Sequence, residues 1–231
     1  MEALARADVR DGDETFEVSW LGARTPTRVV SFLAGRGGDP SRHSPLLTAL
    51  AALGCTVVAP HFPMMASPRV DEEILSTRAR RATLALDALA PRGVPVVGMG
   101  HSLGAATQLA LAGARPWLRK EAPLEVPVDP RIARLVLFAP ATSFLLVPGA
   151  LDAVRAPVTV WAGSEDALAP PESIERLAAA LAGTRTDVRI AEGADHFSFM
   201  HVRPPQTPET LPDRDAFLAQ LVDDVARIVL R

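Results

Sequence analysis

The sequence predicts an α/β protein with a mostly parallel central sheet and helices on both faces. Short apolar runs alternate along the chain with longer segments whose apolar residues repeat at i, i+3 and i+4, the spacing of an amphipathic helix. The runs RLVLFA and VPVVGM are dominated by apolar residues, as is typical of central parallel strands that are covered on both faces. Because strands that alternate with helices form right-handed βαβ units, this order favours one parallel sheet.

The elements are expected in the following order. TFEVSW (15–20) and RVVSFLA (28–34) read as strands, and the short LGARTPT link between them suggests an antiparallel edge. The first helix is expected over 44–54, with Ser44 as its cap and Gly54 as its stop. Further strands are predicted at 55–60, 94–99, 131–139, 156–163 and 186–193, and further helices at 70–90, 102–114, 171–183 and 213–230.

These elements occupy nearly the whole chain, so residues 1–231 are expected to form a single domain. Only the Pro-rich stretch 115–130 and the loop 198–212 interrupt the pattern, and neither repeats nor an interdomain linker are visible. The segment 141–153 could serve as a short lid. It is too short for a lid domain, so we expect a minimal cap, an open site and substrates of small or medium size.

Composition excludes several classes of function. A formal net charge of −3 argues against a nucleic-acid partner and against a polybasic membrane binder. The single Cys55 rules out a disulfide framework and a cysteine-based zinc cluster. The start of the chain lacks the apolar core of a signal peptide, and no apolar run approaches the ~20 residues that span a bilayer. We therefore expect a soluble, cytoplasmic protein without a cofactor or metal, whose partner is a small-molecule substrate. The oligomeric state is not predicted.

The segment Gly100-His101-Ser102-Leu103-Gly104 matches the pattern G-x-S-x-G of a nucleophile elbow. It directly follows one predicted strand and opens a predicted helix, which is the context that the elbow requires. Ser102 must then adopt a strained backbone conformation that lifts its hydroxyl above the sheet, and side chains at positions 100 and 104 would collide there. The helix N-terminus beneath Ser102 favours the negative charge that develops during attack. Ser102 is thus the candidate nucleophile.

A nucleophilic serine needs a base, and the base needs an acid that orients it. Asp166 follows the strand VTVWAG and His196 follows the strand VRIAEG, so the order Ser102, Asp166, His196 places all three beyond strand ends. Glu165 is adjacent to Asp166 but should point elsewhere. Asp195 is more simply read as a cap of its own turn.

The tetrahedral intermediate needs two backbone N–H groups aimed at its oxyanion. Leu103, directly after the nucleophile, should supply one of them. The other is expected from the glycine-rich loop 34–38, with Arg36 as the donor. The guanidinium of Arg36 could meet an anionic substrate, although a solvated side chain is the simpler interpretation. Since the chain has no tyrosine, a phenol is excluded from this role.

The remaining histidines receive structural interpretations. His101 is expected to pack inside the elbow, and His43 and His201 are expected at the surface, without the spacing of a metal site. His61 follows a strand end and could line the pocket. Apolar side chains after the same strand ends suggest an adaptable apolar substrate site, although ordinary core packing explains each of them equally well. This candidate set comprises His61, Phe62, Met64, Met65, Phe144, Leu145, Leu146 and Phe197.

The chain resembles the α/β-hydrolase superfamily, and within it the small esterases similar to dienelactone hydrolase and platelet-activating-factor acetylhydrolase. The resemblance rests on VVAPHFP, VVGMGHSLGAATQLALAGARP, VLFAPAT, PVTVWAGSEDALAPP and GADHFSFM and spans about residues 28 to 201. Two positions depart from it. Position 102 is Ser where dienelactone hydrolase uses cysteine, and the oxyanion loop reads Ala-Gly where relatives often carry His-Gly.

The resemblance implies hydrolysis of carboxylic esters through an acyl-enzyme intermediate rather than cleavage of lactones. The same fold and residues also support the cleavage of thioesters, lactones or C–C bonds, or acyl transfer, and the fold alone does not choose among them. A non-catalytic binding protein on a hydrolase scaffold is the alternative from a different class.

Overall fold

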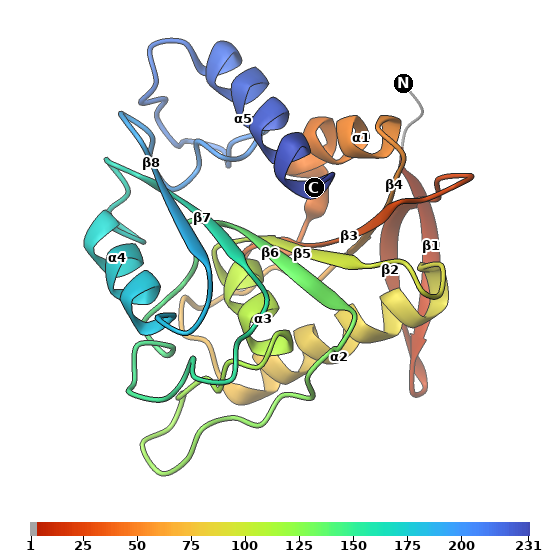
Figure 1. Ribbon diagram of the computed structural model, residues 1–231, viewed down its shortest axis with the longest axis horizontal. Coiled ribbons are helices and arrows are strands. Elements are labelled where there is room, and N and C mark those ends of the chain that lie inside the picture. The colour runs from red at the N-terminus through yellow and green to blue at the C-terminus, as the bar shows by residue number, and fades with distance from the viewer. Residues whose placement is uncertain (1–3) are drawn as a thin grey trace.

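The computed structural model describes residues 4–231. Within this range eight strands form one sheet in the order β1-β2-β4-β3-β5-β6-β7-β8 (Figure 1). All neighbours from β4 to β8 are parallel, whereas β2 runs antiparallel to both β1 and β4. The strands are β1 (Ala5–Asp11), β2 (Glu14–Leu21), β3 (Arg28–Leu33), β4 (Cys55–Pro60), β5 (Val96–His101), β6 (Ile132–Phe138), β7 (Val158–Gly163) and β8 (Thr186–Ala191).

Five α-helices in the described range cover the sheet. Figure 1 shows α1 and α5 on one face and α2 and α3 on the other, while α4 packs against β7 and β8. Asp71 caps α2 by accepting the N–H of Ile74 at 2.8 Å, and Asp213 caps α5 by accepting that of Ala216 at 3.0 Å. The helices are α1 (Ser44–Ala52), α2 (Glu72–Leu89), α3 (Leu103–Leu111), α4 (Pro171–Ala180) and α5 (Arg214–Val229). The expected fold class is thereby confirmed.

The sheet has the expected antiparallel edge, but the strands that pair there differ from the prediction. The first predicted strand (15–20), which is β2 in the structure, pairs with β1 and β4 rather than with β3, so the LGARTPT link carries the chain past β4. β1 was not predicted because its sequence ARADVRD buries only Val9 and therefore shows little apolar pattern. A tight turn with Gly12 at φ 65° joins it to β2.

The first helix begins differently from the prediction. Ser44 is the first helical residue rather than the cap, because a 3₁₀ turn (Pro40–His43) leads directly into α1. Gly54 follows the helix end at φ 91°, a conformation that suits glycine.

The segment 141–153 consists of turns that pack onto the stretch after α3. The N–H of Arg115 donates to Ala150 and that of Trp117 donates to Phe144, both at 2.7 Å. Leu145 and Leu151 are buried, so this segment contributes to the core. No helix among the described residues is both long and apolar enough to cross a membrane.

Candidate active site

Ser102 lies at the sharp turn between β5 and α3, at the carboxyl edge of the sheet. Its backbone has φ 53° and ψ −118°, a strained conformation for a residue with a side chain. The N–H of Ser102 donates to the carbonyl of Phe138 at 2.9 Å, and the carbonyl of Ser102 accepts from Ala141 at 3.1 Å. These two bonds to the end of β6 and the segment that follows it hold the strained turn in place.

The two glycines of the motif are required by close backbone contacts. A Cβ on Gly104 would lie 1.9 Å from the carbonyl oxygen of Leu33, and one on Gly100 would lie 2.6 Å from the nitrogen of Ala105. Both distances are far below van der Waals contact. The glycines therefore allow the elbow and α3 to approach β3 closely.

The side chains of Ser102, His196 and Asp166 form one chain of hydrogen bonds. The Nε2 atom of His196 lies 3.0 Å from the Ser102 hydroxyl oxygen, and its Nδ1 atom lies 2.8 Å from Oδ2 of Asp166. The ionised carboxylate accepts only, so Nδ1 carries the proton and Nε2 is free to accept from the serine hydroxyl. Each residue follows a different strand, and the three meet because parallel strands end at the same edge of the sheet.

The loop after β7 fixes the orientation of Asp166. Its Oδ1 atom accepts the N–H groups of Leu168 and Ala169, each at 2.8 Å. Burial would raise the pKa of this carboxyl, but the hydrogen bonds from His196 and from the two N–H groups outweigh burial and hold the pKa below its usual value. Asp166 is therefore ionised at neutral pH.

The two competing carboxylates lie elsewhere. Glu165 is exposed. Asp195 accepts the N–H of Phe197 at 2.9 Å and forms an ion pair with Arg203, so its carboxylate stabilises its own loop. That loop presents His196 to the site.

The loop after β3 passes directly beside the nucleophile. A Cβ on Gly35 would lie 3.2 Å from Cβ of Ser102, a tight contact that shows how close the loop comes to the nucleophile. Within residues 4–231 the N–H of Arg36 donates to no protein acceptor, and Leu103, as the first residue of α3, has no intrahelical acceptor for its N–H. Both expected oxyanion donors are thus unused. The Arg36 side chain donates to the carbonyl of Met65 at 3.3 Å.

A pocket of about 230 Å³ opens above Ser102 and His196. Of the expected lining residues, Met64 and Phe197 lie on it. Phe62 and Met65 line a neighbouring hollow of about 440 Å³, which also shares Met64. Sequence reasoning missed five further lining residues in the connections that follow strands β3, β7 and β8, and that position was the available signal: Arg42, Leu168, Met200, Pro204 and Pro205.

Other candidate pocket residues do not line either hollow. Leu145 is fully buried and Phe144 nearly so, within the core that segment 141–153 helps to form. His61 lies instead against β1 and β2, with its Nε2 atom 2.8 Å from both the hydroxyl of Ser19 and the guanidinium of Arg6.

The expectation of a surface position for His43 is wrong. His43 is completely buried, with its ring 4.6 Å from that of Phe32 and 5.6 Å from that of His101. The 3₁₀ turn before α1 points the ring inward, and nothing in the local sequence signals this. His101 packs inside the elbow as expected and also donates from Nε2 to the carbonyl of His196 at 2.8 Å. Burial lowers the pKa of His101 to about 3, so it is neutral.

In the part of the chain that the structure describes, no group of three or more His, Cys, Asp or Glu side chains could hold a metal ion.

Three solved structures illustrate what the chain is similar to. An esterase from the Planctomycetes species Thermogutta terrifontis superposes with a TM-score of 0.69 at 19% identity, covering 99% of this chain and 93% of that one. A protein of unknown function from Agrobacterium tumefaciens, grouped with the α/β hydrolases, gives 0.69 at 16% identity and coverages of 97% and 96%. A CIB-like hydrolase from Thermoplasma acidophilum gives 0.61 at 18% identity and coverages of 97% and 99%. No family model and no curated protein matches the sequence. The chain therefore has the α/β-hydrolase fold.

Proposed function

We propose that this protein is a serine hydrolase that cleaves carboxylic esters of small to medium size. The hydrogen-bond chain from the Ser102 hydroxyl through His196 to Asp166, with steps of 3.0 and 2.8 Å, is the observation that carries the proposal. A serine at the strained elbow has no structural need for such a base, whereas nucleophilic catalysis requires one.

In the proposed mechanism the Ser102 oxygen attacks the ester carbonyl and its proton passes to Nε2 of His196. Asp166 keeps the imidazole in the reactive tautomer and stabilises the imidazolium. The tetrahedral intermediate collapses as the C–O bond to the alcohol breaks and His196 protonates the leaving oxygen. Water then attacks the acyl-enzyme, giving its proton to His196, and the Ser102 oxygen leaves and recovers the proton.

The oxyanion of each tetrahedral intermediate would accept hydrogen bonds from the N–H groups of Arg36 and Leu103. Two features support these donors. Neither N–H donates to an acceptor among the residues that the structure describes, and both belong to segments that pass directly beside Ser102. Leu103 also begins α3, whose N-terminus favours negative charge.

The pocket supports small, largely apolar acyl groups. Phe197 and Met200 form part of its wall, and the exposed side chains of Met64 and Leu168 flank it. The Thermogutta esterase 2 has been solved with propionate and with butyrate bound and also phosphorylated by paraoxon. We extend short acyl groups to this chain on the strength of the common fold. The family relationship to dienelactone-hydrolase-like enzymes stays a prediction.

Hydrolysis of p-nitrophenyl acetate, butyrate and octanoate by the wild type and by Ser102→Ala tests the proposal. We expect turnover of the short esters by the wild type and a loss of about 10⁴-fold or more in kcat for Ser102→Ala. Ser143→Ala, at an exposed serine, is the matched control and should retain full activity. A fluorophosphonate should label the wild type at Ser102.

Full ester turnover by Ser102→Ala, or no adduct on Ser102 in the folded wild type, would contradict the proposal. Including a thioester and a lactone of equal acyl length in the panel fixes the bond class, because the preferred substrate is the one with the highest kcat/KM.

A further inference from the structure

Arg78 is a buried cation on the face of α2 that packs under the loop after β3. Only 3% of its surface is exposed, and within residues 4–231 no carboxylate forms a salt bridge with it. Burial lowers the pKa of its guanidinium to about 10, which leaves it charged at neutral pH. An unpaired buried charge is costly unless its hydrogen bonds are made, so its partners should reveal its role.

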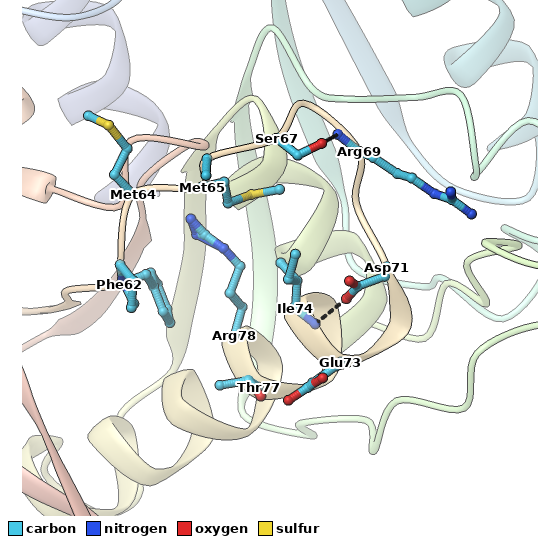
Figure 2. A pocket seen from close by; sticks show the side chains of 12 residues that line it. Phe62, Met64, Met65, Ser67, Arg69, Asp71, Glu73, Ile74, Thr77 and Arg78 are labelled. Carbon is cyan, nitrogen blue, oxygen red and sulfur yellow. Dashed lines mark hydrogen bonds between the residues drawn. The ribbon is translucent and has the colours of Figure 1, made fainter.

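Those partners are two backbone carbonyls of the loop that passes the nucleophile. The guanidinium donates to the carbonyl of Ala34 from both terminal nitrogens at 3.3 Å and to the carbonyl of Gly35 at 2.5 Å. Its central carbon lies 4.2 Å from the centre of the Phe62 ring. Figure 2 shows the Arg78 side chain extending between Phe62 and Ile74 toward Met65. The fork of the guanidinium thus grips two successive peptide groups.

The peptide between Gly35 and Arg36 relates the hydrogen bonds of Arg78 to the proposed reaction. The carbonyl of Gly35 and the N–H of Arg36 belong to one planar trans peptide, so they point in opposite directions. Since Arg78 and the N–H of Gly38, at 3.0 Å, hold the Gly35 oxygen on one side, the Arg36 N–H must face the other. Ser102 lies beside this peptide, because its Cβ is 3.2 Å from the position that a Cβ on Gly35 would take.

The charge of Arg78, like its hydrogen bonds, favours an oxyanion beside the Arg36 N–H. A carbonyl that accepts from a cation polarises its peptide, which makes the N–H of that peptide a stronger donor. Because no carboxylate of the described residues neutralises the guanidinium, its field also favours an anion forming across the loop.

We propose that Arg78 is a positioning residue of the oxyanion hole, which fixes the 35–36 peptide so that the Arg36 N–H points at the developing oxyanion. This inference rests on the proposed function. It assigns Arg78 no contact with substrate: its effect passes through the peptide. The interaction should therefore be stronger in the transition state than in the substrate complex, and its loss should appear in kcat rather than in KM.

The test uses Arg78→Met, with Arg81→Met as the matched control. Arg81 lies on the same helix, is also largely buried, pairs with Asp11 and Glu14, and lies over the ring of Phe16 at 5.2 Å, but it faces the β1–β2 edge. With p-nitrophenyl butyrate we expect kcat of Arg78→Met to fall about 10- to 100-fold, less than for the loss of a whole oxyanion donor, with KM within about threefold of the wild type. Arg81→Met should retain kcat.

Two further measurements separate positioning from mere support of the fold. The inhibition constant of a trifluoromethyl ketone, whose adduct carries the oxyanion, should rise by about the same factor as kcat falls. Arg78 also lines the hollow of about 440 Å³, so in Arg78→Ala millimolar guanidinium chloride can reach the vacated position and should restore part of kcat. The same salt should not accelerate the wild type.

A folded Arg78→Met with wild-type kcat overturns the proposal. The proposal is also overturned if Arg81→Met loses as much activity as Arg78→Met, or if Arg78→Met changes KM alone. A lack of rescue of Arg78→Ala by guanidinium chloride overturns it as well. Should Arg78→Met fail to fold, Arg78→Lys decides, because an ammonium cannot grip both carbonyls as the fork does. A lower kcat at unchanged KM supports the proposal, and an unchanged kcat overturns it.

Failure of this inference is distinguishable from failure of the proposed function. If the wild type hydrolyses no ester and Ser102 takes no fluorophosphonate, the proposed function fails before any Arg78 variant is compared. If the wild type is active and labelled while Arg78→Met retains kcat, only the role of Arg78 is refuted.

Discussion

Replacing Asp166 by asparagine should invert the tautomer of the base rather than simply weaken a hydrogen bond. In the wild type, Oδ1 of Asp166 accepts two N–H groups, from Leu168 and Ala169, at 2.8 Å each. A carboxamide must keep its oxygen at that position, because its NH₂ group would oppose two donors there. The NH₂ group then takes the place of Oδ2, which in the wild type lies 2.8 Å from Nδ1 of His196, and so it faces that nitrogen.

This change at Nδ1 also alters the other ring nitrogen, Nε2. With a donor opposite it, Nδ1 must accept, so the neutral imidazole carries its proton on Nε2. That proton points at the Ser102 hydroxyl, 3.0 Å away, and the base can no longer take the serine proton. The expected loss in kcat is about 10³- to 10⁴-fold, equivalent to about 4–5.5 kcal/mol of transition-state stabilisation.

The assay compares kcat of Asp166→Asn and Glu165→Gln on p-nitrophenyl butyrate near neutral pH, with Tm as the check of folding. Glu165→Gln is the matched control, since it makes the same chemical change at the exposed neighbouring carboxylate. A loss below about tenfold in folded Asp166→Asn, or an equal loss in both variants, would refute the reasoning about the orienting acid.

Two further predictions concern stability. Gly104→Ala should lower the free energy of unfolding by at least about 3 kcal/mol, because its Cβ would lie 1.9 Å from the backbone oxygen of Leu33 in a buried strand. Gly183→Ala, with nothing within 4 Å, is the control, and equal Tm values for the two would contradict this. Hydrogen bonds from two arginines of α2 lower the pKa of Asp11 from 3.8 to about 2, so its stabilising charge is present above pH 3.8 and is lost as the pH falls through about 2. The Tm advantage of the wild type over Asp11→Asn should shrink over that range, and a constant difference would speak against it.

Local patterns were sufficient for the elements that build the site. Strands β5, β7 and β8 are each followed within a few residues by Ser102, Asp166 or His196, and parallel strands bring their carboxyl ends to one edge. The G-x-S-x-G pattern carried its own physical reason, since a side chain at Gly104 would strike β3. The order of these residues along the chain therefore predicted their meeting, and the structure brings them within hydrogen-bond distance.

Local patterns failed where a residue's environment comes from distant segments. β1 was missed because it is a polar edge strand that depends on pairing with β2. His43 was placed at the surface, although the 3₁₀ turn directs its ring against Phe32. Leu145 was a candidate for the pocket wall, but segment 141–153 folds it into the core.

By itself, the sequence determined the fold class and the candidate Ser102, Asp166 and His196, because hydrophobic period and turn chemistry are properties of neighbouring residues. Only the tertiary structure decided which side chains line the pocket and what Arg78 holds. Arg78 and the Gly35 carbonyl are 43 residues apart in the chain. Such a contact has no signature in sequence spacing, because it forms only when the sheet sets α2 beneath the loop after β3.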